Sequence, residues 1–114
     1  MCLFVWHDGD VPTPSRAADA RDSPAGDRAL AAAFKALGDP TRLRLVQAIT
    51  ASEDGELCVC HLTEIAGLSQ ATVSHHMRRL VEAQLATREQ RGKWAYYRLN
   101  RDGFTHMANS LRIT

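Results

Sequence analysis

Apolar residues recur at two different spacings along the chain, and the change between them separates predicted helices from a predicted hairpin. Residues 28–37 place leucine and phenylalanine three or four positions apart, which predicts a first helix. Gly38 should end this helix. Asp39 and Pro40 should start the next one, because Asp is a good N-cap and Pro fits the first helical position. The apolar face of that second helix reaches about Thr50.

Two short helices joined by a tight turn are predicted in the middle of the chain. The first runs from about residue 57 to residue 66, and Gly67 should close it as a C-terminal cap. Ser69 is a suitable N-cap for the second, which continues to about Ala83. A helix, a short turn containing glycine and another helix are typical of the helix-turn-helix motif.

The apolar period changes after Leu85. Residues 86–90 and 94–99 are aromatic or β-capable runs on either side of Arg91-Gly92-Lys93, which predicts a hairpin with a basic tip. A last helix is expected over residues 102–111. The predicted fold is therefore mainly α with a β-hairpin wing, a winged helix-turn-helix domain over residues 27–114. Residues 1–26 hold three of the four prolines and are expected to form a flexible tail that carries Cys2.

Charge is distributed unevenly along the 114 residues, although the net charge is only +1. Residues 1–66 hold six Lys or Arg against ten Asp or Glu, a net of −4. Residues 67–114 hold eight Lys or Arg against three Asp or Glu, a net of +5. A basic C-terminal half of this kind indicates a polyanionic partner such as a phosphate backbone.

The second helix of a helix-turn-helix enters the major groove, and its first turns contact base edges. Gln70 is suited to adenine, and basic residues near the helix end and hairpin tip are suited to phosphates. His75 and His76 point about 100° apart on a helix and form a poor chelate, so DNA contact is favoured for them. The predicted DNA contacts are Ser69, Gln70, Thr72, Ser74, His75, His76, Arg78, Arg79, Arg91 and Lys93, with Arg88 as a further phosphate contact.

Four segments, residues 34–44, 56–60, 69–76 and 91–99, resemble the ArsR/SmtB family of transcriptional repressors in their order and motifs. The resemblance extends from about residue 29 to residue 99. It implies a homodimer built from the first and last helices, a palindromic operator in double-stranded DNA, and release of that DNA when a metal or metalloid binds. Asp102 and His106 on the last helix resemble half of a second metal site known in the family. The second pair of ligands is missing, so zinc or nickel sensing there is not expected.

Three cysteines, Cys2, Cys58 and Cys60, are an odd number in a chain without an export signal, which favours thiols or metal ligands over a disulfide framework. Residues two apart on a regular helix point about 200° apart, so one ion should reach both Cys58 and Cys60 only if the helix start is unwound or distorted. Such a distortion would re-aim the helix that follows and so couple ion binding to DNA binding.

Paired thiolates favour soft ions. The resemblance to arsenic repressors with a Cys-Val-Cys motif implies As(III) or Sb(III) held by three sulfurs. Thr63 stands where the third cysteine is often found, so Cys2 is the expected third ligand, with His61, His7 or water as alternatives. A cadmium or lead sensor on the same cysteines is a close variant, and a thiol redox switch is a different class. The role of His61 stays open.

Other classes fit the sequence poorly. An enzyme is not expected, because the cysteines and nearby histidine have no third polar partner at an informative position. No apolar run approaches the roughly 20 residues that span a bilayer, so no membrane partner is expected. The apolar opening lacks a basic start, so it is not a secretory signal, and the expected location is the cytoplasm.

Overall fold

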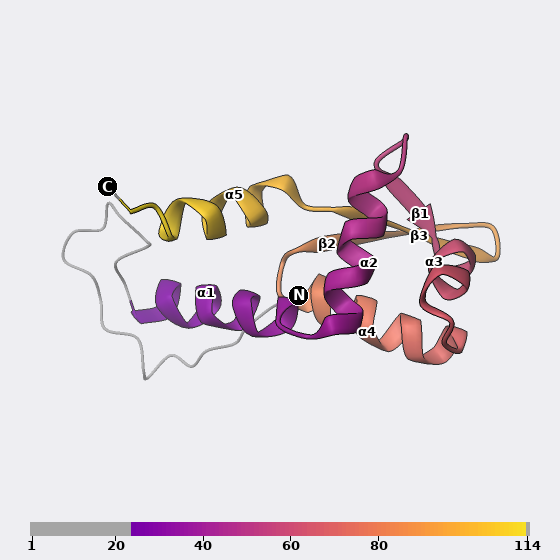
Figure 1. Ribbon diagram of the computed structural model, residues 1–114, viewed down its shortest axis with the longest axis horizontal. Helices are drawn as coiled ribbons and strands as arrows, with labels where there is room; N and C mark the ends of the chain where they lie inside the picture. Colours follow the sequence, from indigo (N-terminus) through magenta and orange to yellow (C-terminus); the bar gives the residue numbers. More distant parts are fainter. Residues whose placement is uncertain (1–23, 114) are drawn as a thin grey trace.

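The computed structural model describes residues 24–113, which form five helices and a three-stranded antiparallel sheet (Figure 1). The predicted winged helix-turn-helix architecture is confirmed. Cys2, His7 and nearly all of the predicted tail lie outside the described residues. In chain order the elements are α1 (Pro24–Leu37), α2 (Pro40–Ala51), β1 (Glu56–Cys58), α3 (Val59–Ala66), α4 (Gln70–Glu82), β2 (Ala86–Arg91), β3 (Trp94–Leu99) and α5 (Arg101–Ser110).

The predicted helix boundaries follow local capping. The Asp39 carboxylate accepts hydrogen bonds from the Thr41 and Arg42 N–H groups at 2.9 and 3.1 Å, and Pro40 opens α2. The Ser69 hydroxyl accepts from the Thr72 N–H at 3.1 Å and starts α4. Helix α3 ends at Gly67, whose φ of +68° lies in the left-handed region that glycine adopts without strain.

Two predicted boundaries are wrong. Helix α1 begins at Pro24, inside the predicted tail and four residues before the predicted start. The helix expected from residue 57 begins only at Val59, because Glu56–Cys58 form strand β1. This strand pairs antiparallel with β3, in the register Glu56 with Arg98 and Cys58 with Tyr96, and the sheet order is β1-β3-β2. Pairing with β3 satisfies the backbone N–H and C=O groups of β1 and those on the side of β3 that faces it. A strand of three residues held by distant partners leaves no alternation in the sequence to detect.

The core lies where α2, α3 and α4 meet the sheet. Each large apolar side chain buried there stabilises the fold by about 1.5–3 kcal/mol relative to an exposed one. The most deeply buried are Leu45, Ile49, Leu62, Val73, Met77, Leu80 and Leu85. Because α3 and α4 share this core, the two helices of the helix-turn-helix are held in a fixed relation to each other.

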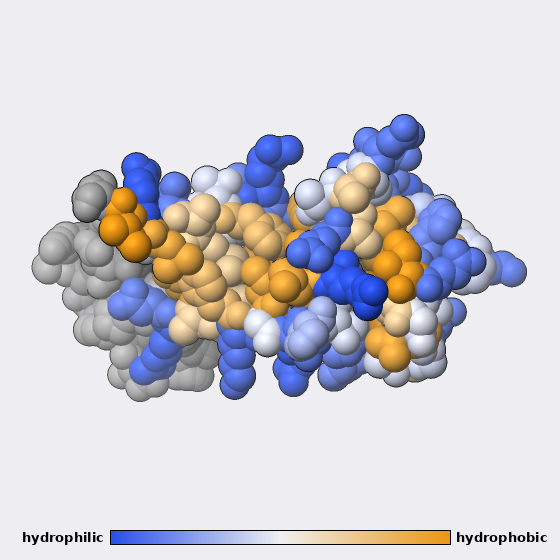
Figure 2. Space-filling model, in the orientation of Figure 1, coloured by the Kyte–Doolittle hydropathy of each residue, from blue (hydrophilic) through white to orange (hydrophobic). Residues whose placement is uncertain are grey.

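Helices α1 and α5 lie side by side and project away from the sheet as an arm (Figure 1). Within this arm only Ala33 of α1 and Met107 of α5 are buried. Apolar side chains gather over its visible face (Figure 2). The arm therefore presents apolar surface that the described chain itself does not cover. No helix in residues 24–113 is long and apolar enough to cross a membrane.

The arm joins the helix-turn-helix through a close contact between α5 and the turn after α4. Gln84 has a φ of +67°, and its carbonyl accepts a hydrogen bond from the Asn100 side-chain amide at 2.8 Å. Gly103 packs against the same carbonyl, and a Cβ at this position would lie 2.4 Å from the oxygen. Only glycine fits there without a shift of the backbone.

Candidate DNA-reading surface and cysteine site

Helix α4 presents most of the predicted DNA contacts to solvent. The exposed side chains are those of Gln70, Thr72, His75, Arg78 and Arg79, and Ser74 is half-buried. Ser69 is also exposed, but its hydroxyl both caps α4 and donates to the Thr72 hydroxyl at 2.9 Å. These two bonds use part of the hydrogen-bonding capacity of Ser69 and Thr72, whereas Gln70 and Arg78 lie open.

A groove of about 400 Å³ separates α4 from the hairpin. Its floor is largely apolar, and its rim is polar and basic, without an acidic side chain among the lining residues. This combination attracts a negatively charged ligand and suits a phosphate backbone. The rim residues are Gln70, Ser74 and Arg78 from α4, with Arg88, Gln90 and Lys93 from the hairpin.

The hairpin turn consists of Gly92 and Lys93, since Arg91 pairs with Trp94. Gly92 has a φ of +63°, and glycine at the first turn position is typical of type II′ hairpins. Lys93 is exposed and has no ion pair with any residue in the described range. Its ammonium is the wing-tip charge that stays available.

Arg91 is in a different situation, because its guanidinium is held by two carboxylates. It donates to both oxygens of Glu56 at 2.6 and 2.8 Å and to Glu89 at 2.7 Å, and it lies 4.3 Å from the centre of the Tyr96 ring. These hydrogen bonds lower the pKa of Glu56 and of Glu89 and raise the pKa of Arg91. Arg91 therefore fastens the wing to β1, a role that competes with the predicted DNA contact.

Glu56 was missed by the sequence analysis. It bridges Arg91 and Arg98, whose Nη2 lies 3.2 Å from the Glu56 carboxylate. Its partners are 35 and more residues away in the chain, and the rest of the strand that carries it was predicted as the start of a helix. If the strand had been predicted, an acidic residue opposite two arginines across the sheet would have indicated these ion pairs.

The adjacent histidines of α4 face different surroundings. His75 is exposed, whereas His76 is half-buried against α2, with its Nδ1 3.4 Å from Arg42 Nη1. Arg42 is itself fixed, because its Nε donates to the Ala36 carbonyl at 2.6 Å. Burial lowers the pKa of His76, the nearby Arg42 and His75 lower it further, and the Asp39 carboxylate opposes them. The structure thus places His76 on the side of α4 that packs against α2.

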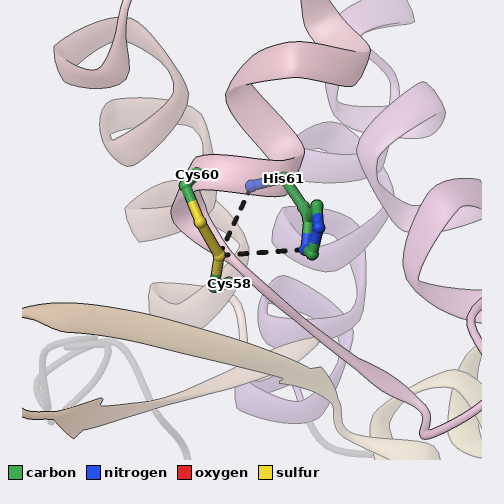
Figure 3. A group of neighbouring side chains, drawn as sticks. All are labelled: Cys58, Cys60 and His61. Atoms are coloured by element: carbon green, nitrogen blue, oxygen red, sulfur yellow. Dashed lines mark hydrogen bonds between the residues drawn. A yellow bond between two sulfur atoms is a disulfide. The ribbon is translucent and has the colours of Figure 1, made fainter.

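Cys58, Cys60 and His61 meet at the junction of β1 and α3 (Figure 3). Cys58 is buried, and its sulfur accepts from the His61 N–H at 3.4 Å as the N-cap of α3. The two cysteines form a disulfide, so the expectation of free thiols does not hold for this pair. The three donor atoms of the group lie within 4.8 Å of one another.

The expected departure from regular helix at this point takes the form of a strand–helix boundary. Cys58 is extended, with a φ of −81° and a ψ of 159°, and only Cys60 belongs to α3. Residues on either side of a strand–helix boundary do not follow the 200° helical offset, so the two sulfurs meet beside a regular helix. Thr63, at the position expected for a third cysteine, instead donates its hydroxyl to the Val59 carbonyl at 2.7 Å.

Thiolates and imidazole nitrogen are the ligands that zinc-like and other thiophilic ions prefer. Among residues 24–113, Cys58, Cys60 and His61 are the one set of three potential ligands held close enough for a metal ion. Asp102 and His106 on α5 do not belong to such a set. The donor chemistry of the β1–α3 junction therefore fits a thiophilic ion once the sulfurs are reduced.

Sequence comparison identifies related regulators. The family profile described as "Bacterial regulatory protein, arsR family" matches residues 39–88. The arsenical resistance operon repressor of Staphylococcus xylosus is 37% identical over 84 residues, 74% of this chain and 78% of the relative. That of Bacillus subtilis is 43% identical over 67 residues, 59% of this chain and 62% of the relative. A Staphylococcus aureus homologue of the cadmium resistance regulatory protein CadC is 44% identical over 71 residues, 62% of this chain and 57% of the relative.

Solved structures that are similar to this chain are also described as transcriptional regulators. A protein described as a possible transcriptional regulator for arsenical resistance is 34% identical, with a TM-score of 0.63 over 72% of this chain and 85% of that one. The antimony-specific repressor AntR is 26% identical, with a TM-score of 0.62 over 87% and 88% of the two chains. A Mycobacterium bovis domain described as a homodimeric winged helix-turn-helix is 23% identical, with a TM-score of 0.66 over 82% and 84%.

The extent of these matches differs between relatives. The match covers 62% of the Bacillus subtilis repressor, and it covers 78% of the Staphylococcus xylosus repressor at 37% identity. With its winged helix-turn-helix fold, this chain belongs to the arsR family of bacterial regulatory proteins.

Proposed function

We propose that this protein is a DNA-binding transcriptional repressor that releases its operator when a thiophilic ion binds Cys58 and Cys60. One observation carries the proposal. Cys58 is both the last residue of β1, within the wing sheet, and the N-cap of α3, the first helix of the helix-turn-helix. A ligand on its sulfur therefore acts on a strand paired with the wing and on the helix packed against α4. The proposed protein is a cytoplasmic regulator and not an enzyme.

DNA binding is assigned to α4 and the groove beside it. We assign base contacts to the exposed polar residues of the first turns of α4 and phosphate contacts to the basic rim. His76 and Arg91 are assigned to holding α4 and the wing in place, because each is bound to another part of the protein. The residues assigned to DNA are Ser69, Gln70, Thr72, Ser74, His75, Arg78, Arg79, Arg88 and Lys93.

A homodimer on a palindromic operator is part of the proposal. Apolar side chains gather on the visible face of the arm of α1 and α5 (Figure 2). Beyond the end of α5, Leu111 is 61% exposed and Ile113 is 92% exposed. Association of two arms would bury this surface and place two copies of α4 on two half-sites. Residues 27–114 would then serve as one DNA-binding and dimerisation unit.

The inducer is proposed to be As(III) or Sb(III), with Cd(II) or Pb(II) as a variant. Relatives named for arsenical, antimony and cadmium responses support this class of ion. The disulfide first has to be reduced, which takes two electrons and two protons from a thiol reductant and yields two thiols. With Cd(II) or Pb(II), Cys58 and Cys60 then bind the ion as thiolates and release two protons. With arsenite, As(OH)3, each As–S bond replaces an As–O bond, and the thiol proton leaves with the hydroxide as water. The third sulfur that As(III) prefers is assigned to Cys2.

Ion binding is expected to act through the β1–α3 junction. Cys58 belongs to a strand paired with the wing, and Cys60 belongs to a helix packed on α4. Their sulfurs, once bound to one ion, fix the angle between that strand and that helix. Release of DNA follows if the fixed angle differs from the one that DNA selects.

The test is a DNA-binding titration of the reduced protein on DNA from upstream of its own gene, with and without each ion. Arsenite, antimonite, cadmium or lead should release the DNA. Cys58→Ser and Cys60→Ser should bind DNA within about twofold of the wild type but ignore the ion; serine at position 58 preserves the N-cap of α3. Release from either variant would contradict the site, and no DNA binding by the wild type would contradict the function.

The third sulfur has its own test. Cys2→Ser should lose release by arsenite, and adding Thr63→Cys should restore it, because this substitution places a sulfur one turn beyond Cys60. Thr63→Ser, which keeps the hydroxyl bond to the Val59 carbonyl, is the matched control. Full arsenite response in Cys2→Ser would show that residue 2 is not a ligand.

A thiol redox regulator is the second candidate, and the Cys58–Cys60 disulfide favours it. In this scheme a peroxide takes two electrons from the two thiols, which form the disulfide while the peroxide is reduced to water. Peroxide should then release DNA without any ion and with the loss of two free thiols per chain. Release by ions alone would set this candidate aside.

A further inference from the structure

The imidazole of His61 lies beside the two sulfurs and turns toward Cys58 (Figure 3). Its Nδ1 is 3.9 Å from Cys58 Sγ, and all three donor atoms lie within 4.8 Å of one another. In a tetrahedral site with metal–sulfur bonds of about 2.3 Å and metal–nitrogen bonds of about 2.0–2.1 Å, sulfur and nitrogen are about 3.6 Å apart. The distance of Nδ1 from Cys58 Sγ is thus within a few tenths of an ångström of the separation that a shared ion needs. The two sulfurs, now bonded to each other, must separate to about 3.8 Å after reduction.

Packing does not explain this position of the ring. His61 is exposed, and its backbone N–H alone suffices to bond the Cys58 sulfur that caps α3. The recorded contact of Nδ1 within the described residues is with that same sulfur. A sulfur that accepts one N–H bond retains further lone pairs, so the cap and a bound ion are compatible.

We propose that His61, with Cys58 and Cys60, forms a second coordination mode of this site, selective for a divalent ion of the zinc group such as Cd(II) or Zn(II). The inference rests on the proposed function and deepens it. Two thiolates and one imidazole leave a fourth position to water, as in known two-cysteine, one-histidine zinc sites. As(III) and Sb(III) have no comparable use for the nitrogen, because their preferred set is three sulfurs.

The third ligand therefore determines which ion the site takes. Cys58 and Cys60 are common to both modes, Cys2 completes the metalloid mode, and His61 completes the divalent mode. One site then answers two classes of toxic ion through different third ligands. His61 is the specificity-determining residue of the divalent mode.

The experiment measures ion binding and DNA release separately on the full-length, reduced protein. Cadmium binding is followed by the ultraviolet charge-transfer absorption of cadmium–thiolate bonds and by the cadmium NMR shift, which separates two-sulfur from three-sulfur sites. His61→Ala should weaken cadmium binding by at least the roughly 10–100-fold typical of losing even an outer-shell partner, and should leave arsenite binding unchanged. Cys2→Ser should do the reverse.

His106→Ala is the matched control, since it removes an imidazole from α5, outside the ligand group, and should alter neither ion. Unchanged cadmium affinity and NMR shift in His61→Ala would overturn the second mode while leaving the proposed function intact. If Cys58→Ser still binds both ions with wild-type affinity, the proposed function fails as well. The two failures are thus distinguishable.

Discussion

Helix α4 and the wing are both basic in sequence, but their cations have different surroundings. Arg78 of α4 borders the open groove without an ion pair in residues 24–113. In the wing, Arg91 and Arg98 share the Glu56 carboxylate, and Lys93 alone at the tip is unpaired within the same range. Formal charge along a chain therefore overstates the charge that can reach a phosphate, since part of it holds the wing to β1.

The largest effect should come from α4. Arg78→Ala removes an unpaired guanidinium from the groove, and a hydrogen bond to a charged group contributes about 1.5–3 kcal/mol. DNA affinity should fall about 10–100-fold, and the slope of log affinity against log salt should decrease by about one. Fluorescence anisotropy at several salt concentrations measures both quantities. Arg101→Ala, exposed on α5, is the control, and equal losses in both variants would remove the distinction.

Lys93→Ala should give the next largest effect. Loss of the one unpaired cation at the wing tip should lower DNA affinity by up to about tenfold and reduce the salt slope by about one. Lys93→Arg should restore both values, because a phosphate accepts either cation. An unchanged salt slope in Lys93→Ala would place the wing tip away from the DNA backbone.

Glu56→Gln should have a smaller effect of opposite sign. Loss of the carboxylate charge frees Arg91 and Arg98, so DNA affinity should rise by roughly twofold to fivefold and the salt slope should steepen. Glu82→Gln is the matched control, because Glu82 lies only 3.9 Å from exposed Arg79. Weaker DNA binding by Glu56→Gln would mean that the position of the wing matters more than its free charge.

The smallest effect concerns the pH dependence of stability and the two histidines on different sides of α4. Burial lowers the pKa of His76, so the unfolded chain takes up a proton at higher pH than the folded one. The free energy of unfolding should therefore decrease as the pH falls below about 6.5 toward the lowered pKa. His76→Gln should reduce this dependence in denaturant titrations at several pH values, and by more than His75→Gln, because His75 is only one of the charges near His76. An identical dependence in all three proteins would contradict the assigned environment.

Local signals predicted much of the fold. Asp39, Ser69 and Gly67 mark helix ends through hydrogen bonds or φ values that depend only on nearby residues, and these boundaries were confirmed. Strand β1 was missed because its three residues are extended only through pairing with β3. The ion pairs of Glu56 depend on that strand, so they were missed with it.

The candidate site was predicted in composition but not in geometry. Cys58 and Cys60 were identified as a pair from their types and spacing, and their meeting was expected to need an unwound or distorted helix start, whose form the sequence did not show. The strand–helix boundary that brings them together depends on the same distant pairing. The direction of the His61 ring toward Cys58 likewise follows from where α3 begins, which spacing alone did not reveal.

The tight fit of Gly103 on the Gln84 carbonyl has a consequence for the spacing of half-sites in the proposed operator. It holds the start of α5 against the end of α4, so the arm and α4 keep a fixed orientation to each other. In the proposed dimer, the separation of the two recognition helices would have to match half-sites about 34–36 Å apart. Gly103, which is not among the residues assigned to DNA, would thus help to set the separation of the two α4 helices.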